Sequence, residues 1–284
     1  MTFNAKRFLL KPPANLAGWM RELPVEDLPV LARTGYELED WREFEEQVDL
    51  QMLDDLVSAD PLMTAKLFGF VAKRRGKDVP SEAENVREAV LLIGTAAFFR
   101  ALGTNSAAEV LLAEQGPALE EFQEVMERAR RAARLSAAFA SQRDDPDTGL
   151  LGSAAMLHHL PELIIWLKAP ALAAELLRQK RAAPEGPFDD MERGVLNVSL
   201  DELRLELMKS WRLPARIARL ATSHTNLDEQ QVKNVRLALK ASRHAGADWE
   251  DPALGDLVRE IGDFLQLGLQ PTWGLLKKVE ALDS

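Results

Sequence analysis

The sequence contains no cysteine and only four histidines. Without cysteine, a disulfide framework, a thiolate zinc site and a cysteine nucleophile are all excluded. Any metal site would have to be built from His, Asp and Glu side chains. Two of the histidines, His158 and His159, are adjacent within an otherwise apolar run. Whether this pair binds a metal largely decides whether the protein is an enzyme.

Long hydrophobic runs are also missing. The longest one, Ala89–Phe99, is far shorter than the roughly 20 residues that a membrane span needs. The N-terminal segment has a basic pair and a very short apolar patch, but neither an extended hydrophobic region nor a small-residue cleavage site follows. We therefore expect no transmembrane helix, no membrane partner and a cytoplasmic location.

The chain lacks an excess of positive charge. Its 35 Lys and Arg residues are outnumbered by 45 Asp and Glu residues, for a net charge of −10. Sequence-independent affinity for a phosphate backbone depends on many Lys and Arg contacts, so nucleic acid is not expected as a partner. With 284 residues, 46% of them hydrophobic, the chain can bury a core as one large domain or two smaller ones.

Helix signals recur along the chain, whereas no convincing pattern of period two predicts a strand. Asp60 followed by Pro61 predicts a helix start, because the Asp side chain can accept hydrogen bonds from the first turn and Pro loses none there. Gly94 is expected to close one helix in a left-handed conformation and Thr95 to cap the next. Further apolar stripes at helical spacing mark residues 120–142, 232–239 and 254–265.

The C-terminal half carries a second set of helix boundaries. Ser199 and Glu202 have the spacing of a capping box, and Pro214 restarts a helix after a short bend. We predict that Trp211 and Leu213 are buried where the two helices around Pro214 meet. Segments 143–149 and 182–190 are rich in Pro, Gly and Asp and are predicted to be loops. The predicted fold class is all-α.

Five short motifs occur in an order that indicates a family: LPVEDLPVL (23–31), LVSADPLMTAKLFGFV (56–71), NVREAVLLIGTAAFFRALG (85–103), SAAMLHHLPELI (153–164) and WRLPARIARLATSH (211–224). In this order they resemble the HDOD family, an all-helical bacterial signalling domain related to the HD metal-dependent phosphohydrolases. The resemblance implies an N-terminal extension (1–22), an HDOD-like domain (23–245) and a C-terminal helical extension (246–284). Within the domain it implies an N-terminal helical bundle (23–116) packed on a degenerate HD-like helical bundle (117–245).

The same resemblance implies where a metal site would lie. Catalytic HD enzymes use an early His, a His-Asp doublet, further His residues and a late Asp to hold ions that activate water. Here His158 occupies the histidine of the doublet, but His159 stands in place of its aspartate, and the helix expected to bring the early His has none. The late Asp falls near Ser242, and His224 lies near a downstream ligand. We therefore interpret His158, His159, His224 and Ser242 as vestigial positions and expect no metal, no cofactor and no enzymatic activity. The interpretation places the histidine pair at a helix end, with local hydrogen bonds.

A basic cluster lies within residues 120–142 and comprises Arg128, Arg130, Arg131 and Arg134. It could contact an anion or an acidic partner. However, Glu124 and Glu127 stand four residues before Arg128 and Arg131, which favours helix ion pairs on a solvated face. The short basic run 73–77 is likewise interpreted as an exposed turn without a specific ligand.

The function that this sequence favours is a non-catalytic regulatory module of bacterial signal transduction that acts through protein–protein contacts with signalling proteins. No receiver, cyclic-nucleotide synthase or DNA-binding module is recognised in these residues, so we expect the output to travel by association with another chain. Two alternatives remain open. One is a divergent metal-dependent HD phosphohydrolase, which would need a carboxylate close to His158 and His224. The other is a sensor that binds a nucleotide or another small molecule in the vestigial pocket.

Overall fold

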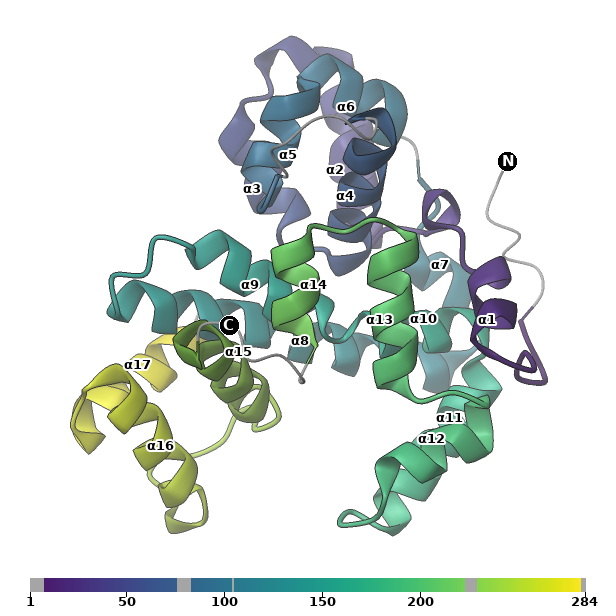
Figure 1. The fold of residues 1–284 in the computed structure, drawn as a ribbon. Helices are drawn as coiled ribbons and strands as arrows, with labels where there is room; N and C mark the ends of the chain where they lie inside the picture. The colour runs from purple at the N-terminus through teal and green to yellow at the C-terminus, as the bar shows by residue number, and fades with distance from the viewer. Residues whose placement is uncertain (1–7, 76–82, 104, 223–228, 282–284) are drawn as a thin grey trace. The chain divides into compact units, whose positions relative to one another are not determined.

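The computed structural model describes residues 8–75, 83–103, 105–222 and 229–281. Within these ranges the regular structure is helical, and the single extended pairing is a parallel bridge between Val30 and Ala107. The all-α prediction is therefore confirmed (Figure 1). Two compact units form, one from Met1–Val125 with His159–Ala215 and the other from Met126–His158 with Arg216–Ser284. The domain boundaries expected from the resemblance stay predictions.

The first unit contains the N-terminal helices and a second group that follows the histidine pair. Its elements are α1 (Leu16–Glu22), η1 (Val25–Asp27), α2 (Ala32–Trp41), η2 (Arg42–Gln47), α3 (Leu50–Val57), α4 (Pro61–Arg75), α5 (Val86–Ile93), α6 (Thr95–Leu102), α7 (Ala108–Leu112), α10 (Leu160–Lys168), α11 (Pro170–Ala182), α12 (Phe188–Leu196) and α13 (Leu200–Ser210). The long helix α8 (Gly116–Gln142) begins in this unit and continues into the second.

The start of α4 is fixed by Asp60, as the sequence predicts. Its Oδ1 accepts hydrogen bonds from the amides of Leu62 (2.9 Å) and Met63 (3.0 Å). Its Oδ2 accepts a third bond, at 2.8 Å, from the amide of Leu31, at the start of α2. Asp60 is fully buried, and this burial raises the pKa of its carboxyl group above the usual value. A local cap thus also joins two helices that are distant in sequence.

The junction between α5 and α6 differs in one respect from the prediction. Gly94 closes α5 with a positive φ of 80°, which favours glycine, but its ψ of 151° is extended and not that of a left-handed helix. Thr95 does not cap α6, because it is already the first helical residue and Gly94 occupies the cap position. The turn is therefore one residue shorter than predicted, because Gly94 alone serves as the cap of both helices.

The second group of helices in the first unit packs in sequence. Helix α10 contacts α11, α11 contacts α12, and both α1 and α10 contact α13. The capping box predicted at the start of α13 is confirmed, since Ser199 and Glu202 each bond the other's backbone amide. Trp19 of α1 is fully buried and its indole Nε1 donates to the carbonyl of Leu196 at 2.9 Å. This bond holds α1 to the end of α12.

The second unit contains the end of α8 and six further elements: α9 (Thr148–Leu157), α14 (Ala215–Ala221), α15 (Glu229–Ala241), η3 (Pro252–Leu254), α16 (Gly255–Leu265) and α17 (Leu269–Glu280). Helix α15 contacts both α9 and α16, and α16 contacts α17. The core of this group joins apolar side chains from α8, α15, α16 and α17 around the buried indole of Trp249. The C-terminal segment therefore contributes to the same core as α8 and α15.

Residues Thr148–Lys168, which include α9 and α10, form the one stretch in the described ranges that is long and apolar enough to cross a membrane. In the sequence this stretch is not one continuous apolar run, because His158 and His159 interrupt it. In its most apolar part 89% of the residues are buried within the protein, as in the core helices of a folded domain.

Candidate functional site

The histidine pair occupies the junction between α9 and α10. His158 is the residue that ends α9, and His159 precedes the first residue of α10. The Nδ1 atom of His158 lies 2.9 Å from the carbonyl oxygen of Ala221, which is 63 residues away in the chain. Because a carbonyl oxygen only accepts, Nδ1 carries the proton in this bond. The position at a helix end agrees with the sequence analysis, but this hydrogen bond is long-range and not local.

Ser242, at the position of the late acidic ligand, is also buried. Its Oγ donates to the carbonyl of Leu239 at 3.0 Å, which ties the hydroxyl to the end of its own helix. Its backbone carbonyl accepts a bond of 3.2 Å from the Nη1 of Arg131 on α8. A guanidinium group therefore contacts the residue at which the resemblance would place a metal-binding carboxylate.

The prediction that Arg131 forms an ion pair with Glu127 on a solvated face is wrong. The side chain of Arg131 is only 11% exposed, and its Nε lies 3.6 Å from Oε1 of Glu280 on α17. Glu127 instead pairs with Arg130 at 2.7 Å, three residues along α8. The Nε and Nη2 atoms of Arg134 are buried as well. Part of the basic cluster thus faces the interior of the second unit, whereas Arg128 and Arg130 are half-buried.

A further polar contact joins α8 to α15. The hydroxyl of Ser136 donates to Oδ1 of Asn234 at 2.7 Å, and both residues are almost completely buried. Together with the bond between Arg131 and Ser242, this contact forms a polar seam along the two helices. Local sequence patterns do not reveal this seam, because its paired residues lie 98 and 111 positions apart.

Two acidic side chains of the second unit come before α9, but both already have partners. Oδ2 of Asp147 accepts hydrogen bonds from Arg216 and, at 3.0 Å, from Gln231, and the bond from Arg216 lowers the pKa of Asp147. Asp145 accepts a longer bond of 3.3 Å from the same Gln231 amide. In the ranges that the structure describes, no three His, Asp or Glu side chains gather as a metal ion would require. His224 lies outside those ranges.

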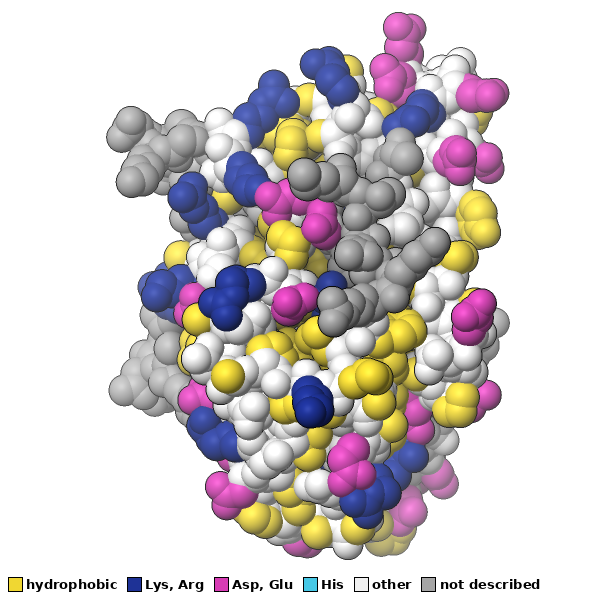
Figure 2. Space-filling model, turned by 90° about the vertical axis from the view of Figure 1, so that its right-hand side faces the viewer, with side chains coloured by type: hydrophobic (Ala, Val, Ile, Leu, Met, Phe, Trp, Pro, Cys, Tyr) yellow, Lys and Arg dark blue, Asp and Glu magenta, His cyan; other side chains and the backbone are white. Residues whose placement is uncertain are grey.

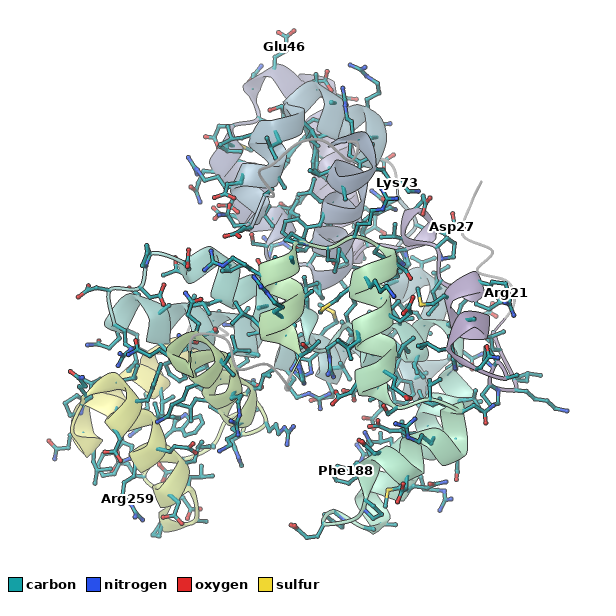
Figure 3. All side chains as sticks on the ribbon, in the orientation of Figure 1. Arg21, Asp27, Glu46, Lys73, Phe188 and Arg259 are labelled. Atoms are coloured by element: carbon teal, nitrogen blue, oxygen red, sulfur yellow. The ribbon has the colours of Figure 1, made fainter. Side chains whose placement is uncertain are left out.

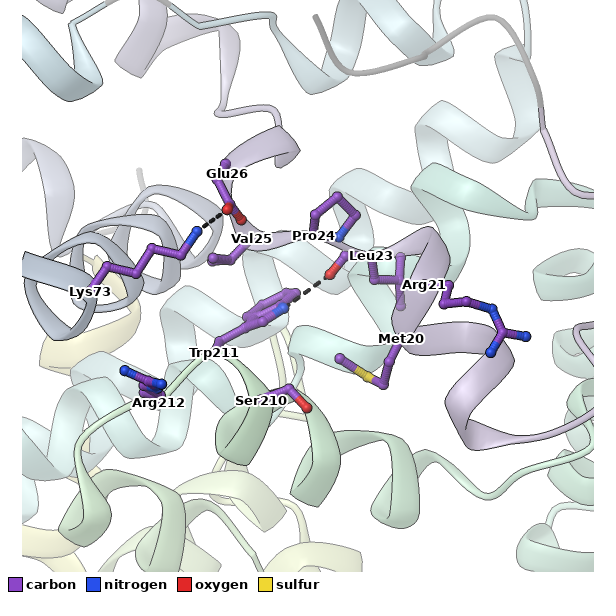
Figure 4. Close-up of a pocket in the computed structure, with 10 residues that line it drawn as sticks. All are labelled: Met20, Arg21, Leu23, Pro24, Val25, Glu26, Lys73, Ser210, Trp211 and Arg212. Atoms are coloured by element: carbon purple, nitrogen blue, oxygen red, sulfur yellow. Dashed lines mark hydrogen bonds and ion pairs between the residues drawn. The ribbon is translucent and has the colours of Figure 1, made fainter. Parts of the chain in front are cut away.

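A cavity of about 520 Å³ lies in the first unit beside the end of α13. Trp211 lines it and is 4% exposed, and Leu213 is 6% exposed, so the prediction that both are buried is confirmed. The indole Nε1 of Trp211 donates to the carbonyl of Leu23 at 3.0 Å (Figure 4). A Cβ atom added to Gly69 of α4 would lie 3.0 Å from the side chain of Val25, which also lines the cavity. Helix α4 therefore packs closely against this side of the cavity.

The rim of this cavity carries charged side chains from three segments. Lys73 of α4 pairs with Glu26 of η1, Arg21 lies in the last turn of α1, and Arg212 directly follows Trp211 (Figure 4). Lys73 belongs to α4, so the predicted basic turn begins inside a helix. The rest of that run after Arg75 lies outside the described residues. On the face drawn in Figure 2, basic side chains form small groups among acidic and hydrophobic ones.

Comparisons with known proteins identify the family. The HDOD domain family model matches residues 28–227. A structure of the MmoQ response regulator from Methylococcus capsulatus is 22% identical, with a TM-score of 0.65 over 89% of this chain and 98% of that chain. A virulence factor from Campylobacter jejuni is 19% identical, with a TM-score of 0.62 over 88% of this chain and 90% of that one. None of the curated proteins matches the sequence significantly.

The two solved structures share the fold of this chain at low identity, and the family match covers most of the sequence. The match includes His158, His159 and Trp211, whereas Ser242 and helices α16 and α17 lie beyond its end. On the strength of the family match, the chain belongs to the HDOD family.

Proposed function

We propose that this chain is a non-catalytic regulatory module of a bacterial signalling pathway and that it acts through contacts with other proteins. Membership of the HDOD family supports a role in signalling. The name of the structurally similar Methylococcus protein, a response regulator, agrees with such a role. The proposed partners are signalling proteins in the cytoplasm, and neither nucleic acid nor membrane is proposed as a partner.

The observation that carries the non-catalytic part of the proposal is the position of Arg131. An arginine remains protonated at any physiological pH, so its guanidinium is a permanent positive charge. Without compensation, two unit positive charges about 4 Å apart repel by about 4 kcal/mol at an effective dielectric constant near 20, and a divalent ion doubles that repulsion. The carboxylate of Glu280, 3.6 Å from Arg131, offsets part of it. A metal ion near Ser242 would therefore be disfavoured, since Arg131 contacts the backbone carbonyl of that residue.

The C-terminal helix reinforces this arrangement. Glu280 of α17 lies 3.6 Å from Arg131 and supplies the negative charge that a buried guanidinium needs. Its carboxylate thus balances the charge of an arginine of the protein itself, whereas the acidic groups of a metal-dependent hydrolase bind a metal cation. This pairing favours a structural role for the buried charges over a catalytic one.

One feature favours the alternative of a divergent phosphohydrolase. A histidine that binds a metal commonly donates its other ring N–H to a carbonyl or carboxylate, and the Nδ1 of His158 makes such a bond to Ala221. The same bond also stabilises a histidine with no ligand, because it satisfies a polar atom at a helix end. The two functions differ in whether the protein hydrolyses phosphate esters.

The proposal is tested by affinity purification of the tagged full chain from its native host, with reconstitution of each candidate complex from purified components. We expect at least one signalling protein to bind the purified chain directly, and we expect no hydrolysis of p-nitrophenyl phosphate or bis-p-nitrophenyl phosphate. A chain that binds no reconstituted partner, and that hydrolyses either ester in a manner lost in His158→Ala, would contradict the proposal.

A further inference from the structure

The cavity beside Trp211 is positively charged, although the whole chain is acidic. Its lining contains three basic side chains, Arg21, Lys73 and Arg212, and one acidic side chain, Glu26. The chain as a whole has a net charge of −10. A local reversal of sign at a cavity attracts ligands of opposite charge and raises their association rate.

Two of these cations are available to a ligand. Arg21 and Arg212 are both exposed, and neither side chain has an acidic partner within the described part of the chain. A guanidinium presents five N–H donors in a planar fork, which matches the two oxygens of a carboxylate. Lys73 and Glu26 pair with each other, but each side chain is 54% exposed, and exposed pairs contribute little stability. That pair can open to admit a competing anion.

The backbone at Arg212 closes α13 in a left-handed turn: the amide of Leu213 donates to the carbonyl of Met208 at 2.9 Å, and the amide of Arg212 donates to the carbonyl of Lys209 at 3.1 Å, the pair of bonds that commonly ends a helix. Arg212 has a φ of 55°, in the left-handed region, directly after α13 ends. A glycine would adopt this conformation without strain, whereas a residue with a Cβ costs about 1 kcal/mol more. This turn places Arg212 at the rim of the cavity.

The arrangement of the two arginines indicates the shape of the ligand. Figure 4 shows Arg21 and Arg212 on opposite sides of the cavity, with Leu23 and Trp211 between them. Figure 3 also shows Arg21 and Lys73 along the same edge of the chain. A compact anion would be held best by cations that converge on one point. Separated cations with apolar residues between them suit an extended segment with acidic groups on either side of an apolar one.

We propose that this cavity binds an acidic segment of a partner protein, with separate carboxylates of that segment held by Arg21 and Arg212 and an apolar side chain placed against the wall around Trp211. The indole N–H of Trp211 is already bonded to Leu23, so the wall offers apolar contact and not a further hydrogen bond. The inference rests on the proposed function, because it takes the ligand to be a protein.

The experiment uses a fluorescein-labelled nine-residue peptide with leucine at every third position and Glu or Asp elsewhere. A matched peptide carries Gln and Asn in place of the acids. Binding to the full chain is followed by fluorescence anisotropy at low and high salt. The test variant is Arg21→Gln with Arg212→Gln. The control is Arg100→Gln with Arg236→Gln, which removes the same charge from exposed positions on α6 and α15.

We expect the acidic peptide to bind the parent and the control variant with similar affinity, at least tenfold more tightly than the test variant, and more weakly as salt rises. The neutral peptide should not bind. Equal affinity for the test and control variants would overturn the inference, because any binding would then follow net charge alone. Absence of peptide binding to the parent would overturn it too. If the parent binds inorganic pyrophosphate but not the acidic peptide, the cavity is a site for compact anions and the inference is also overturned.

The outcome is separable from that of the proposed function. If a reconstituted partner binds the test variant as tightly as the parent, this cavity is not part of the interface, although the proposed function through protein contacts still stands. Hydrolase activity dependent on His158 would contradict the proposed function, yet the anisotropy measurement would still report whether the cavity binds the acidic peptide.

Discussion

Replacing Trp211 tests how the first unit is held together at the end of α13. The side chain is 4% exposed, and its Nε1 donates to the carbonyl of Leu23, which lies 188 residues away. Removing a buried tryptophan side chain typically costs about 3–5 kcal/mol. The carbonyl of Leu23 would also lose its indole donor, which costs about 1–3 kcal/mol where water cannot replace it. Because these contributions overlap, we expect Trp211→Ala to lower the free energy of unfolding by about 4 kcal/mol.

A second variant separates packing from hydrogen bonding. Trp211→Phe retains an aromatic ring but removes the donor to Leu23, so we expect a loss of about 1.5 kcal/mol. The measurement is the midpoint of urea and thermal unfolding, followed by circular dichroism at 222 nm. At about 2–4 °C per kcal/mol, the Ala variant should melt about 8–16 °C below the parent. If Trp211→Ala melts within one degree of the parent, the account of this wall is refuted.

Two further predictions concern charge and backbone strain in the first unit. Burial lowers the pKa of Lys66 from 10.5 to about 8 in the folded chain. Between these pH values the unfolded chain therefore binds more protons than the folded one, so the free energy of unfolding should rise with pH across this window. The urea midpoint of the parent should therefore increase between about pH 8 and pH 10.5 relative to Lys66→Met, and parallel profiles would contradict the assignment. Arg212→Gly should raise the free energy of unfolding by about 1 kcal/mol, because glycine adopts a φ of 55° without strain. The same variant should bind the acidic peptide more weakly. A Gly variant less stable than the parent would show that the backbone at this position is not strained.

Features set by neighbouring residues were predictable from the sequence. Asp60 with Pro61 and Ser199 with Glu202 cap their helices because the bonded groups lie within three residues of each other. The order of the motifs was likewise sufficient to indicate the family. Thr95 is not the cap that the sequence predicts, because Gly94 both ends α5 and precedes the first residue of α6, and residue spacing alone does not distinguish these two arrangements.

The candidate sites depended on contacts that the sequence does not encode locally. Both Arg130 and Arg131 lie within reach of Glu127 on a helix, and only the packing of α8 against α15 and α17 decides that Arg131 turns inward. The cavity beside Trp211 could not be found from the sequence, because its wall joins residues near positions 23 and 211. One sequence feature does mark its position: Arg212 is a charged residue between the apolar residues Trp211 and Leu213, just before the helix that follows Pro214.

We propose that the HD-like centre does not bind a catalytic metal, because Arg131 contacts Ser242, the position of the late ligand. The most direct test is elemental analysis of the full chain after incubation with Mn, Fe, Ni and Zn salts and removal of free ions. We predict no stoichiometric metal in the parent and no change in His158→Ala. About one metal ion per chain, lost in His158→Ala, would contradict the claim.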